Sequence, residues 1–263
     1  MTTQMLIYET AVPVSNGRHG KASIDGNNKF AFSRGVNSVP LMALEFPEAA
    51  SEYAIVFAAS GDDVVPLVIL GVRAQENLYL NAADEWQAQY IPAFVRRYPF
   101  VFSTSDDGQT FTLCVDEAFQ GLNFLGRGQA LFTTEGKPSA YTDGVMKFLQ
   151  EYRNQFLRTQ AFCRKLKQLD IFEPMQAEFT LGDAPKLSLT GFMVISRDKL
   201  RSLSGDVLAD LIRTDELELL YLHLQSMRNF TRIKDRLVQI ENAKPAAQAA
   251  EPTAALEAPA TVQ

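Results

Sequence analysis

Cysteine and histidine, the side chains from which disulfides and most zinc sites are built, are scarce in this sequence. Its 263 residues include two cysteines and two histidines. Cys114 and Cys163 lie in segments of different periodicity, which predicts buried thiols in a reducing compartment rather than a disulfide scaffold. Neither His19 nor His223 begins a His-x-His or His-Glu-x-x-His spacing, so we expect no metal site and no cofactor.

Signatures of nucleophilic and nucleotide-dependent catalysis are missing as well. The sequence has no Gly-x-Ser-x-Gly elbow, and neither cysteine lies in a recognised catalytic setting. The stretch GLNFLGRG, residues 121–128, lacks the lysine-serine ending of a phosphate loop and the dinucleotide spacing. We interpret it as a flexible loop, and a less favoured alternative is that it lines a ligand cleft. No carboxylate pair stands out as acid and base, so we assign no catalytic residue and favour a protein that is not an enzyme.

Long apolar runs and a net positive charge are also lacking. The net charge is −6 and the pI about 5.1, which provides no global basic field for nucleic acid. The longest apolar run, VVPLVILGV, is too short to span a bilayer and is predicted to be a strand. The first residues have neither a basic region nor a long apolar core, so we expect no signal peptide. The expected location is the cytoplasm, with export by a signal-independent route as the alternative.

The patterns that are present predict an α+β fold with a hairpin-rich antiparallel sheet. Two apolar runs flank the turn at residues 60–63, and Pro66 is expected at a strand start or on an edge. A second hairpin surrounds Asp107 and Gly108, and a third surrounds the turn at residues 182–185. His19 follows an Asn-Gly turn and is expected to be exposed or at a strand edge.

The second half of the sequence is predicted to form helices that cover one face of this sheet. Apolar residues recur at helical spacing from Ser139 to Asp170, and short helices are predicted to start at Ser196 and Ser204. A last helix is predicted from Thr214 to Asn242, with His223 as a surface or hydrogen-bonded imidazole beside its apolar stripe. We expect one domain over residues 1–242 and a disordered Ala/Pro-rich tail over residues 243–263.

The last helix also carries basic residues beside its apolar stripe. The stripe is expected to pack on the sheet of its own domain, and pairing with a second subunit through this helix is the alternative. For the basic side chains a solvated face is favoured over contact with an acidic partner, nucleic acid or lipid headgroups. These residues are Arg228, Arg232, Lys234 and Arg236.

The stretch YIPAFVRRYPF stands out because two arginines lie among aromatic residues. A helix is predicted from Asp84 to the residue before Pro99, with Trp86, Tyr90 and Arg97 on one face and a kink or two short turns at Pro92. One interpretation is a patch that binds an anionic small molecule, a glycan or a protein. Its candidate residues are Arg96, Arg97, Trp86, Tyr90 and Tyr98, with Arg73 as a weaker member.

The other interpretation of this stretch is structural. Arginines near a helix C-terminus interact favourably with the helix dipole and can pair with a carboxylate of the same chain, such as Glu45 or Asp84. Between the two arginines we choose Arg97 as the functional one, because the predicted helix places it beside Trp86 and Tyr90.

Several motifs together resemble the SapC family of proteobacterial proteins, whose name comes from a surface-layer gene cluster. The resemblance runs from about Tyr8 to Leu237. The motifs are VPLMALEFPEAASEYAIVF, GVRAQENLYL, YIPAFVRRYPF, LFTTEGKPS, LTGFMVISRDKLRSLSGDVLADL and YLHLQSM.

The resemblance implies a role in surface-layer or outer-envelope biology, near outer-membrane uptake receptors and flavin or iron oxygenases. It brings no assigned catalytic residues, and the permease label of some members does not fit a sequence without membrane spans. We therefore expect a non-enzymatic binding or accessory protein. The alternatives are an enzyme working with a neighbouring oxygenase, with His19, the glycine loop and Arg96 in one cleft, or a self-assembling structural subunit.

Overall fold

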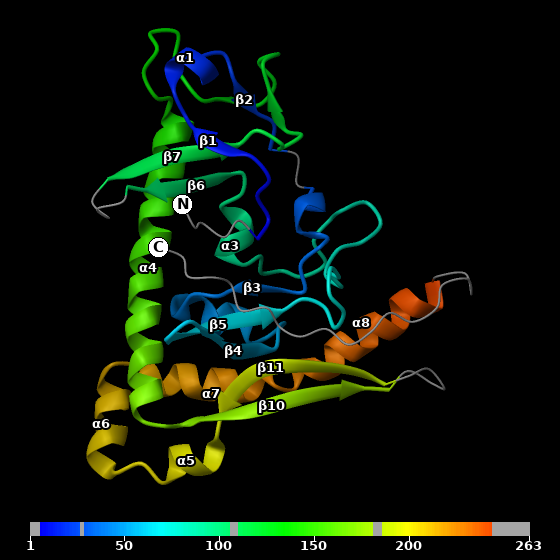
Figure 1. The fold of residues 1–263 in the computed structure, drawn as a ribbon, viewed down its shortest axis with the longest axis vertical. Helices are drawn as coiled ribbons and strands as arrows, with labels where there is room; N and C mark the ends of the chain where they lie inside the picture. The colour runs from blue at the N-terminus through cyan, green and yellow to red at the C-terminus, as the bar shows by residue number, and fades with distance from the viewer. Residues whose placement is uncertain (1–5, 27–28, 106–109, 181–185, 244–263) are drawn as a thin grey trace.

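The computed structural model describes residues 6–26, 29–105, 110–180 and 186–243. Figure 1 shows a lower part built around β3, β4, β5, β10 and β11, and an upper part that contains β1, β2, β6 and β7, with the long helix α4 running along one side of both. The predicted turns at Asp107–Gly108 and at residues 182–185, and the tail from residue 244 onward, lie outside the described residues.

The secondary structure alternates short and long elements. The strands are β1 (Ala11–Pro13), β2 (Ser23–Ile24), β3 (Ser38–Pro40), β4 (Ile55–Ser60), β5 (Asp63–Ile69), β6 (Phe100–Thr104), β7 (Phe111–Asp116), β8 (Leu122–Asn123), β9 (Gln129–Ala130), β10 (Phe172–Phe179) and β11 (Leu187–Ile195). The helices are α1 (Asn16–His19), α2 (Phe46–Ala49), α3 (Ala93–Arg96), α4 (Ala140–Gln168), α5 (Arg197–Arg201), α6 (Gly205–Arg213), α7 (Glu216–Ser226) and α8 (Asn229–Ala243). Two 3₁₀ turns complete the set, η1 (Ala31–Ser33) and η2 (Ala43–Glu45).

The largest sheet has the strand order β10-β11-β4-β5-β3 and is antiparallel throughout. The first predicted hairpin forms β4 and β5, and the third predicted hairpin extends the same sheet. Along β4 the buried side chains alternate between two cores: Ile55 and Phe57 face one, Val56 and Ala58 the other. Because both faces of this strand are covered, its sequence is apolar without interruption. The predicted α+β class with a hairpin-rich antiparallel sheet is confirmed.

Pro66 does not lie at a strand start or on an edge, so that prediction was wrong. It lies inside β5, opposite Phe57 of β4, and β5 has a neighbour on each side. The pairing with β3 ends at Pro40 opposite Leu67, which is the residue that follows Pro66. The Pro66 carbonyl still accepts a hydrogen bond from the N–H of Leu41. A proline is tolerated here because the residue pairing of β3 with β5 ends at Leu67, so the missing donor falls outside that pairing.

The second predicted hairpin forms β6 and β7 in a different sheet, of order β1-β7-β6. A third small sheet, β8-β2-β9, lies in the upper part of the molecule. Its β8 lies within the glycine-rich stretch at residues 121–128, and β9 follows that stretch directly. The upper part therefore places the N-terminal strand, the second hairpin and the glycine loop close together.

Helix α4 connects the two parts. The helix begins where the sequence predicted, and Ser139 is its N-cap: the hydroxyl oxygen accepts a hydrogen bond from the N–H of Thr142 at 3.2 Å. Leu149, in the first half of the helix, belongs to the core beneath β6 and β7, whereas Phe162 and Leu166 belong to the core of the large sheet. One continuous apolar stripe thus fixes the upper part on the lower one.

The C-terminal segment is two helices rather than the single helix predicted from Thr214. Asp215, not Thr214, is the N-cap of α7, and its φ of 57° is left-handed. Helix α7 ends at Ser226 and α8 begins at Asn229. Leu220 of α7 packs in the core on one face of the large sheet, whereas Ile233 and Leu237 of α8 are buried in the core on the other face. The apolar stripe is therefore used within the chain, as the favoured interpretation stated, and pairing of subunits through this helix stays an untested prediction.

The predicted helix from Asp84 to Pro99 is mostly absent. Asp84 has a left-handed φ of 62°, and only Ala93–Arg96 is helical, directly after Pro92. Proline disfavours the helical conformation of the residue before it and removes a donor, so a helix can start at Pro92 but not pass through it. Trp86 instead forms an isolated β-bridge with Leu80. The shared helix face on which we chose Arg97 does not exist.

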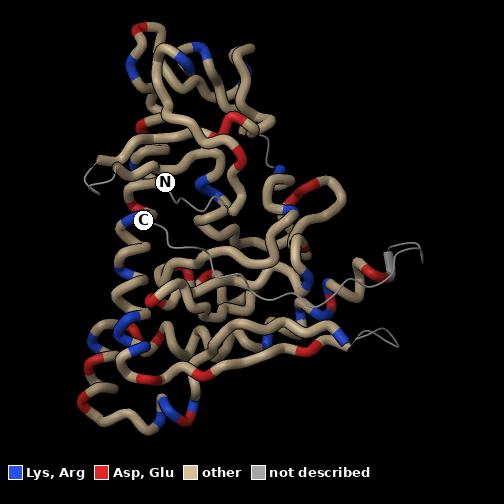
Figure 2. The backbone as a smooth tube through the Cα atoms, in the orientation of Figure 1, with Lys and Arg blue, Asp and Glu red and all other residues tan. Residues whose placement is uncertain are grey.

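Within the described part of the chain, no helix is long and apolar enough to cross a bilayer. Acidic and basic residues are interspersed along the backbone (Figure 2). On α8, Arg232 donates to the carbonyl of Ser51, and Arg236 donates to the carbonyl of Gln87 while its guanidinium lies 4.3 Å from the centre of the Tyr79 ring. Two of the four basic residues predicted to form a solvated face thus bind the rest of the fold.

Candidate functional site

Arg97, the arginine chosen from the sequence, is inside the protein. Its exposed fraction is 6%, and its guanidinium carbon lies 4.2 Å from the Phe94 ring centre, 5.0 Å from that of Tyr152 and 5.5 Å from that of Tyr8. Among the described residues, its Nε atom and the hydroxyl of Tyr152 are buried without a hydrogen-bond partner. Burial raises the pKa of Tyr8 to about 12 although Arg97 opposes the shift, so this hydroxyl stays protonated. Arg97 is thus held by aromatic rings and faces no solvent.

Arg96, in contrast, is exposed and contacts two aromatic rings. Its guanidinium carbon lies 5.8 Å from the ring centre of Tyr90 and 5.4 Å from that of Phe148, and its Nε donates to the carbonyl of Ile91 at 2.9 Å. The Tyr90 hydroxyl donates to Glu45 Oε1 at 2.6 Å. Burial and the Glu45 carboxylate raise the pKa of Tyr90. Arg96 and Tyr90 therefore belong to one cluster, and the rings that Arg96 contacts are different from those that surround Arg97.

The carboxylates predicted to pair with these arginines have other partners. Glu45 is buried and accepts hydrogen bonds from the backbone N–H groups of Met42 and Ala93, in addition to Tyr90. Asp84 pairs with Arg34. A carboxylate that receives backbone N–H groups needs no cation to be satisfied. The structural interpretation was therefore wrong about Glu45 and Asp84 as partners of Arg96 and Arg97, and Arg97 is instead buried against aromatic rings.

Trp86 and Arg73 also serve the fold. The indole N–H of Trp86 donates to the Tyr53 hydroxyl at 2.8 Å, and its ring meets that of Phe30 edge-on at 5.6 Å. Arg73 forms ion pairs with Glu76 at 2.8 Å and with Glu241 at 3.0 Å, which tie the loop after β5 to α8. Neither residue lines the pocket described next.

Tyr98, another predicted site residue, lines a pocket. The pocket has a volume of about 470 Å³ and lies between β1, the end of β7 and the glycine loop. The Tyr98 ring stacks on Phe32 with centres 3.9 Å apart and meets Phe119 edge-on at 5.4 Å. Burial, followed by the nearby Asp116 carboxylate, raises the pKa of Tyr98, so at neutral pH its hydroxyl is a hydrogen-bond donor and not a base.

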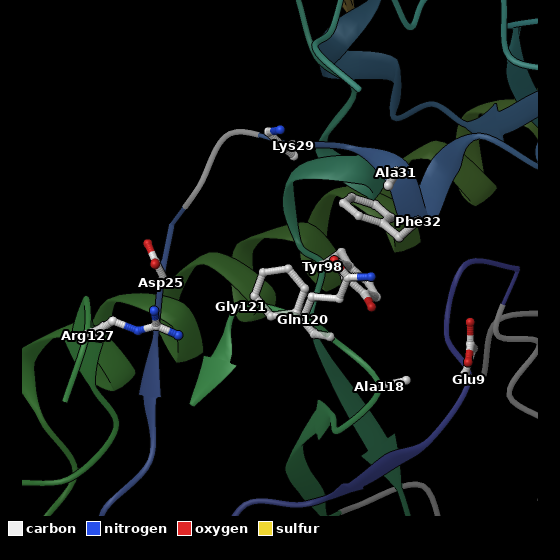
Figure 3. Close-up of a pocket in the computed structure, with 11 residues that line it drawn as sticks. Glu9, Asp25, Lys29, Ala31, Phe32, Tyr98, Ala118, Gln120, Gly121 and Arg127 are labelled. Carbon is white, nitrogen blue, oxygen red and sulfur yellow. The ribbon is translucent and has the colours of Figure 1, made fainter. Parts of the chain in front are cut away.

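Charged side chains of both signs surround these rings. Figure 3 shows Asp25 and Arg127 on one side of Tyr98, Glu9 on the opposite side and Lys29 above. Among the residues that the structure describes, these four side chains form no ion pair or hydrogen bond, whereas charges elsewhere on the surface pair repeatedly. The remaining lining residues are Ala31, Ala118, Gln120 and Gly121.

Asp116, which is buried, and Gly121 fix the shape of this pocket. The Asp116 carboxylate accepts hydrogen bonds from the N–H groups of Glu9 and Thr10 at 2.9 Å and from that of Ala118 at 3.1 Å, which holds two lining segments together. At Gly121, a Cβ atom would lie 2.6 Å from the carbonyl oxygen of Asp25, so only glycine allows this close approach. The glycine loop does line a cleft, through Gly121 and Arg127, as the sequence suggested.

The cleft proposed for the enzyme hypothesis is not assembled. His19 is fully buried, contrary to the prediction of an exposed or edge position: the Ser15 N–H donates to its Nδ1 at 3.3 Å and its Nε2 lies 3.2 Å from Glu117. Neither His19 nor Arg96 lines the pocket. His223 is buried between β4 and β11, bonded to the backbone of Ile55 and Ile195. In the described part of the chain, no group of three or more potential metal ligands gathers.

Sequence reasoning missed most of the pocket. Glu9, Asp25, Lys29 and Phe32 come from segments without a recognisable motif. One signal could have indicated these residues: acidic, basic and aromatic residues lie around short strands near the N-terminus. This signal does not identify a pocket unless it is known which strands pair.

Comparison with known proteins identifies the family. No curated protein and no solved structure matches the chain. The sequence model described as SapC matches residues 14–233, which is most of the 263 residues. The chain therefore belongs to the SapC family.

Proposed function

We propose that this chain is a non-enzymatic binding or accessory protein of surface-layer or outer-envelope biology, and that the pocket beside Tyr98 binds a charged saccharide unit. One observation carries the proposal: four charged side chains that form no ion pair or hydrogen bond within the described residues surround three aromatic rings in a pocket of about 470 Å³. Pockets of this size suit small-molecule ligands. The resemblance of the motifs to surface-layer-associated proteins supports the biological setting.

The chemistry of the lining favours a polar ring with an ionised substituent. Arg127 and Lys29 can bind an acidic group, and a guanidinium can do so with two parallel hydrogen bonds. Glu9 and Asp25 can accept hydrogen bonds from hydroxyl or ammonium groups, and the protonated Tyr98 hydroxyl can donate one. The aromatic edges supply apolar contact for the ring carbons.

Calorimetric titration tests this proposal with three classes of sugar: acidic sugars, amino sugars and neutral sugars. We expect an acidic sugar to bind and Arg127→Gln to weaken it by about tenfold, since a hydrogen bond to a charged group contributes roughly 1.5–3 kcal/mol. Arg158→Gln is the matched control, because Arg158 is an exposed arginine on α4 away from the pocket. If no charged sugar binds, or if both variants bind equally well, the pocket does not have this function.

A further inference from the structure

The loop between β8 and β9 presents two adjacent large apolar side chains to solvent. Phe124 is 59% exposed and Leu125 is 77% exposed, the highest value among the exposed large apolar residues of the described chain. All residues from 124 to 130 are exposed. Apolar side chains that are exposed singly are common, but a contiguous pair at a loop tip is a feature of interaction sites.

This tip is held in place by the chain around it. The Asn123 side chain is buried, and its Nδ2 donates to the carbonyls of Ser23, Gly121 and Arg127. Its Oδ1 accepts from the N–H groups of Leu125 and Arg127 at 3.1 Å. These bonds fix the backbone on both sides of the apolar pair, so its exposure is a defined feature of the fold.

Glycine geometry supports the same conclusion. Gly128 has a left-handed φ of 85°, and a Cβ atom there would lie 2.1 Å from the carbonyl oxygen of Ile24. The loop therefore returns against β2 through a contact that only glycine permits. Gly126, at the tip, also has a positive φ, of 71°, and open space around it.

The charges beside the tip are basic. Arg127 follows it directly, and Lys21 leads into β2, whose Ser23 pairs with Asn123 of β8. Both cations are exposed and form no ion pair within the described residues. The unpaired acid in the same region is Asp25, which lines the pocket, while Glu117 is paired with Arg18. The surroundings of the tip are thus more basic than the chain as a whole, whose net charge is −6.

We propose that the Phe124–Leu125 tip inserts into the interface of a lipid bilayer that contains anionic headgroups. The area of the tip favours a bilayer over a protein partner: a stable protein interface buries about 800 Å² on each side, far more than two side chains on a convex loop supply. A bilayer interface requires only a few apolar side chains placed about 5–10 Å deep, with cations beside them for the headgroups. Phe124 and Leu125 provide the apolar side chains, and Lys21 and Arg127 provide the cations.

Co-sedimentation of the full chain with vesicles tests the proposal without any sugar ligand. We expect binding to vesicles of phosphatidylcholine mixed with phosphatidylglycerol, and at least about tenfold weaker binding for the double variant Phe124→Ser/Leu125→Ser, because the apolar insertion is lost. Lys21→Gln should weaken binding by about fivefold and does not touch the pocket. Ile212→Ser, at a residue 60% exposed on α6, is the control and should bind like the native chain.

A variant that gains a signal on binding distinguishes loss of membrane binding from loss of folding. In Leu125→Trp the new indole should shift its fluorescence to shorter wavelength on vesicles and be quenched by brominated acyl chains. The proposal is overturned if the native chain fails to sediment with these vesicles, if the double variant sediments equally, or if the Leu125→Trp emission does not respond. Loss of self-association in the double variant without lipid, seen by light scattering, would instead identify the tip as a contact between copies and also overturn it.

Discussion

Replacing Arg97 should change the stability of the protein and leave ligand capture intact. The sequence suggested the reverse, because a helix face shared with Trp86 and Tyr90 would have exposed the guanidinium. In the structure Arg97 is 6% exposed, lies among the rings of Tyr8, Phe94 and Tyr152, and does not line the pocket. Arg97→Ala and Arg97→Met separate the contribution of packing from that of charge.

The expected magnitudes follow from two opposing contributions. Truncation to alanine leaves a cavity among the rings, and large-to-small changes in a core cost roughly 2–5 kcal/mol. Removal of a buried cation whose Nε has no partner in the described chain relieves a desolvation penalty, which partly offsets this loss. We therefore expect Arg97→Ala to lose about 2 kcal/mol, near the lower end of the cavity range. Arg97→Met keeps most of the volume and should lie within about 1 kcal/mol of the native chain.

Urea unfolding at neutral pH measures both variants, and thermal melting provides a second readout. For chains of this size a loss of 2 kcal/mol lowers the midpoint temperature by roughly 4–8 °C. If Arg97→Met is as destabilising as Arg97→Ala, the guanidinium makes polar interactions that matter more than its packing, and the reasoning is refuted. An unchanged midpoint in Arg97→Ala would show that the ring cage is not packed in solution.

Three further changes test local features of the fold. Burial lowers the pKa of His223 to about 4 from about 6.5 in the unfolded chain, so the unfolded state takes up the proton first as the pH falls. The free energy of unfolding should therefore fall by roughly 3 kcal/mol as the pH drops from 6.5 towards 4. In His223→Gln, the free energy of unfolding measured in urea should depend less on pH over this range. Ser139→Ala should cost about 1 kcal/mol in urea unfolding, and Ser204→Ala less, because its capping bond is longer, 3.4 Å against 3.2 Å. Asn123→Ala should speed amide exchange at residues 123–127 with little change in global melting, because its bonds hold that loop and join it to β2 at Ser23.

The hairpins and long helices could be predicted because their signals are local. The turn at Gly61, where φ is 59°, lies between two β-branched runs, and the hydroxyl of Ser139 caps the longest apolar stripe. The alternation of Ile55 and Val56 between two cores depends only on the two-residue period of a strand. Sequence could not show that the second hairpin joins β1 rather than the large sheet, since strand pairing between distant segments has no local signature.

The central segment shows how a correct observation led to a wrong structure. Trp86, Tyr90 and Arg97 do have helical spacing, and Asp84 is a suitable N-cap residue. Tertiary contacts decided otherwise: the Trp86 indole bonds Tyr53, and the Tyr90 N–H bonds the Glu52 carboxylate at 2.8 Å. Such contacts outweigh a helix propensity worth a few tenths of a kcal/mol per residue.

The candidate site was foreseen only at the residues that belong to a compact motif. Tyr98 was named because it adjoins the arginine pair, and the loop at residues 121–128 because it is rich in glycine. Their charged neighbours Glu9, Lys29 and Arg127 meet only after β1 pairs with β7 and β2 with β8 and β9. These charges have no ion-pair partner among the residues that the structure describes, and this property of the folded chain is what indicates ligand binding. Carboxylates and cations are common in any sequence. Where the fold holds such a group beside an aromatic stack and no described residue pairs with it, a ligand of opposite charge can bind there.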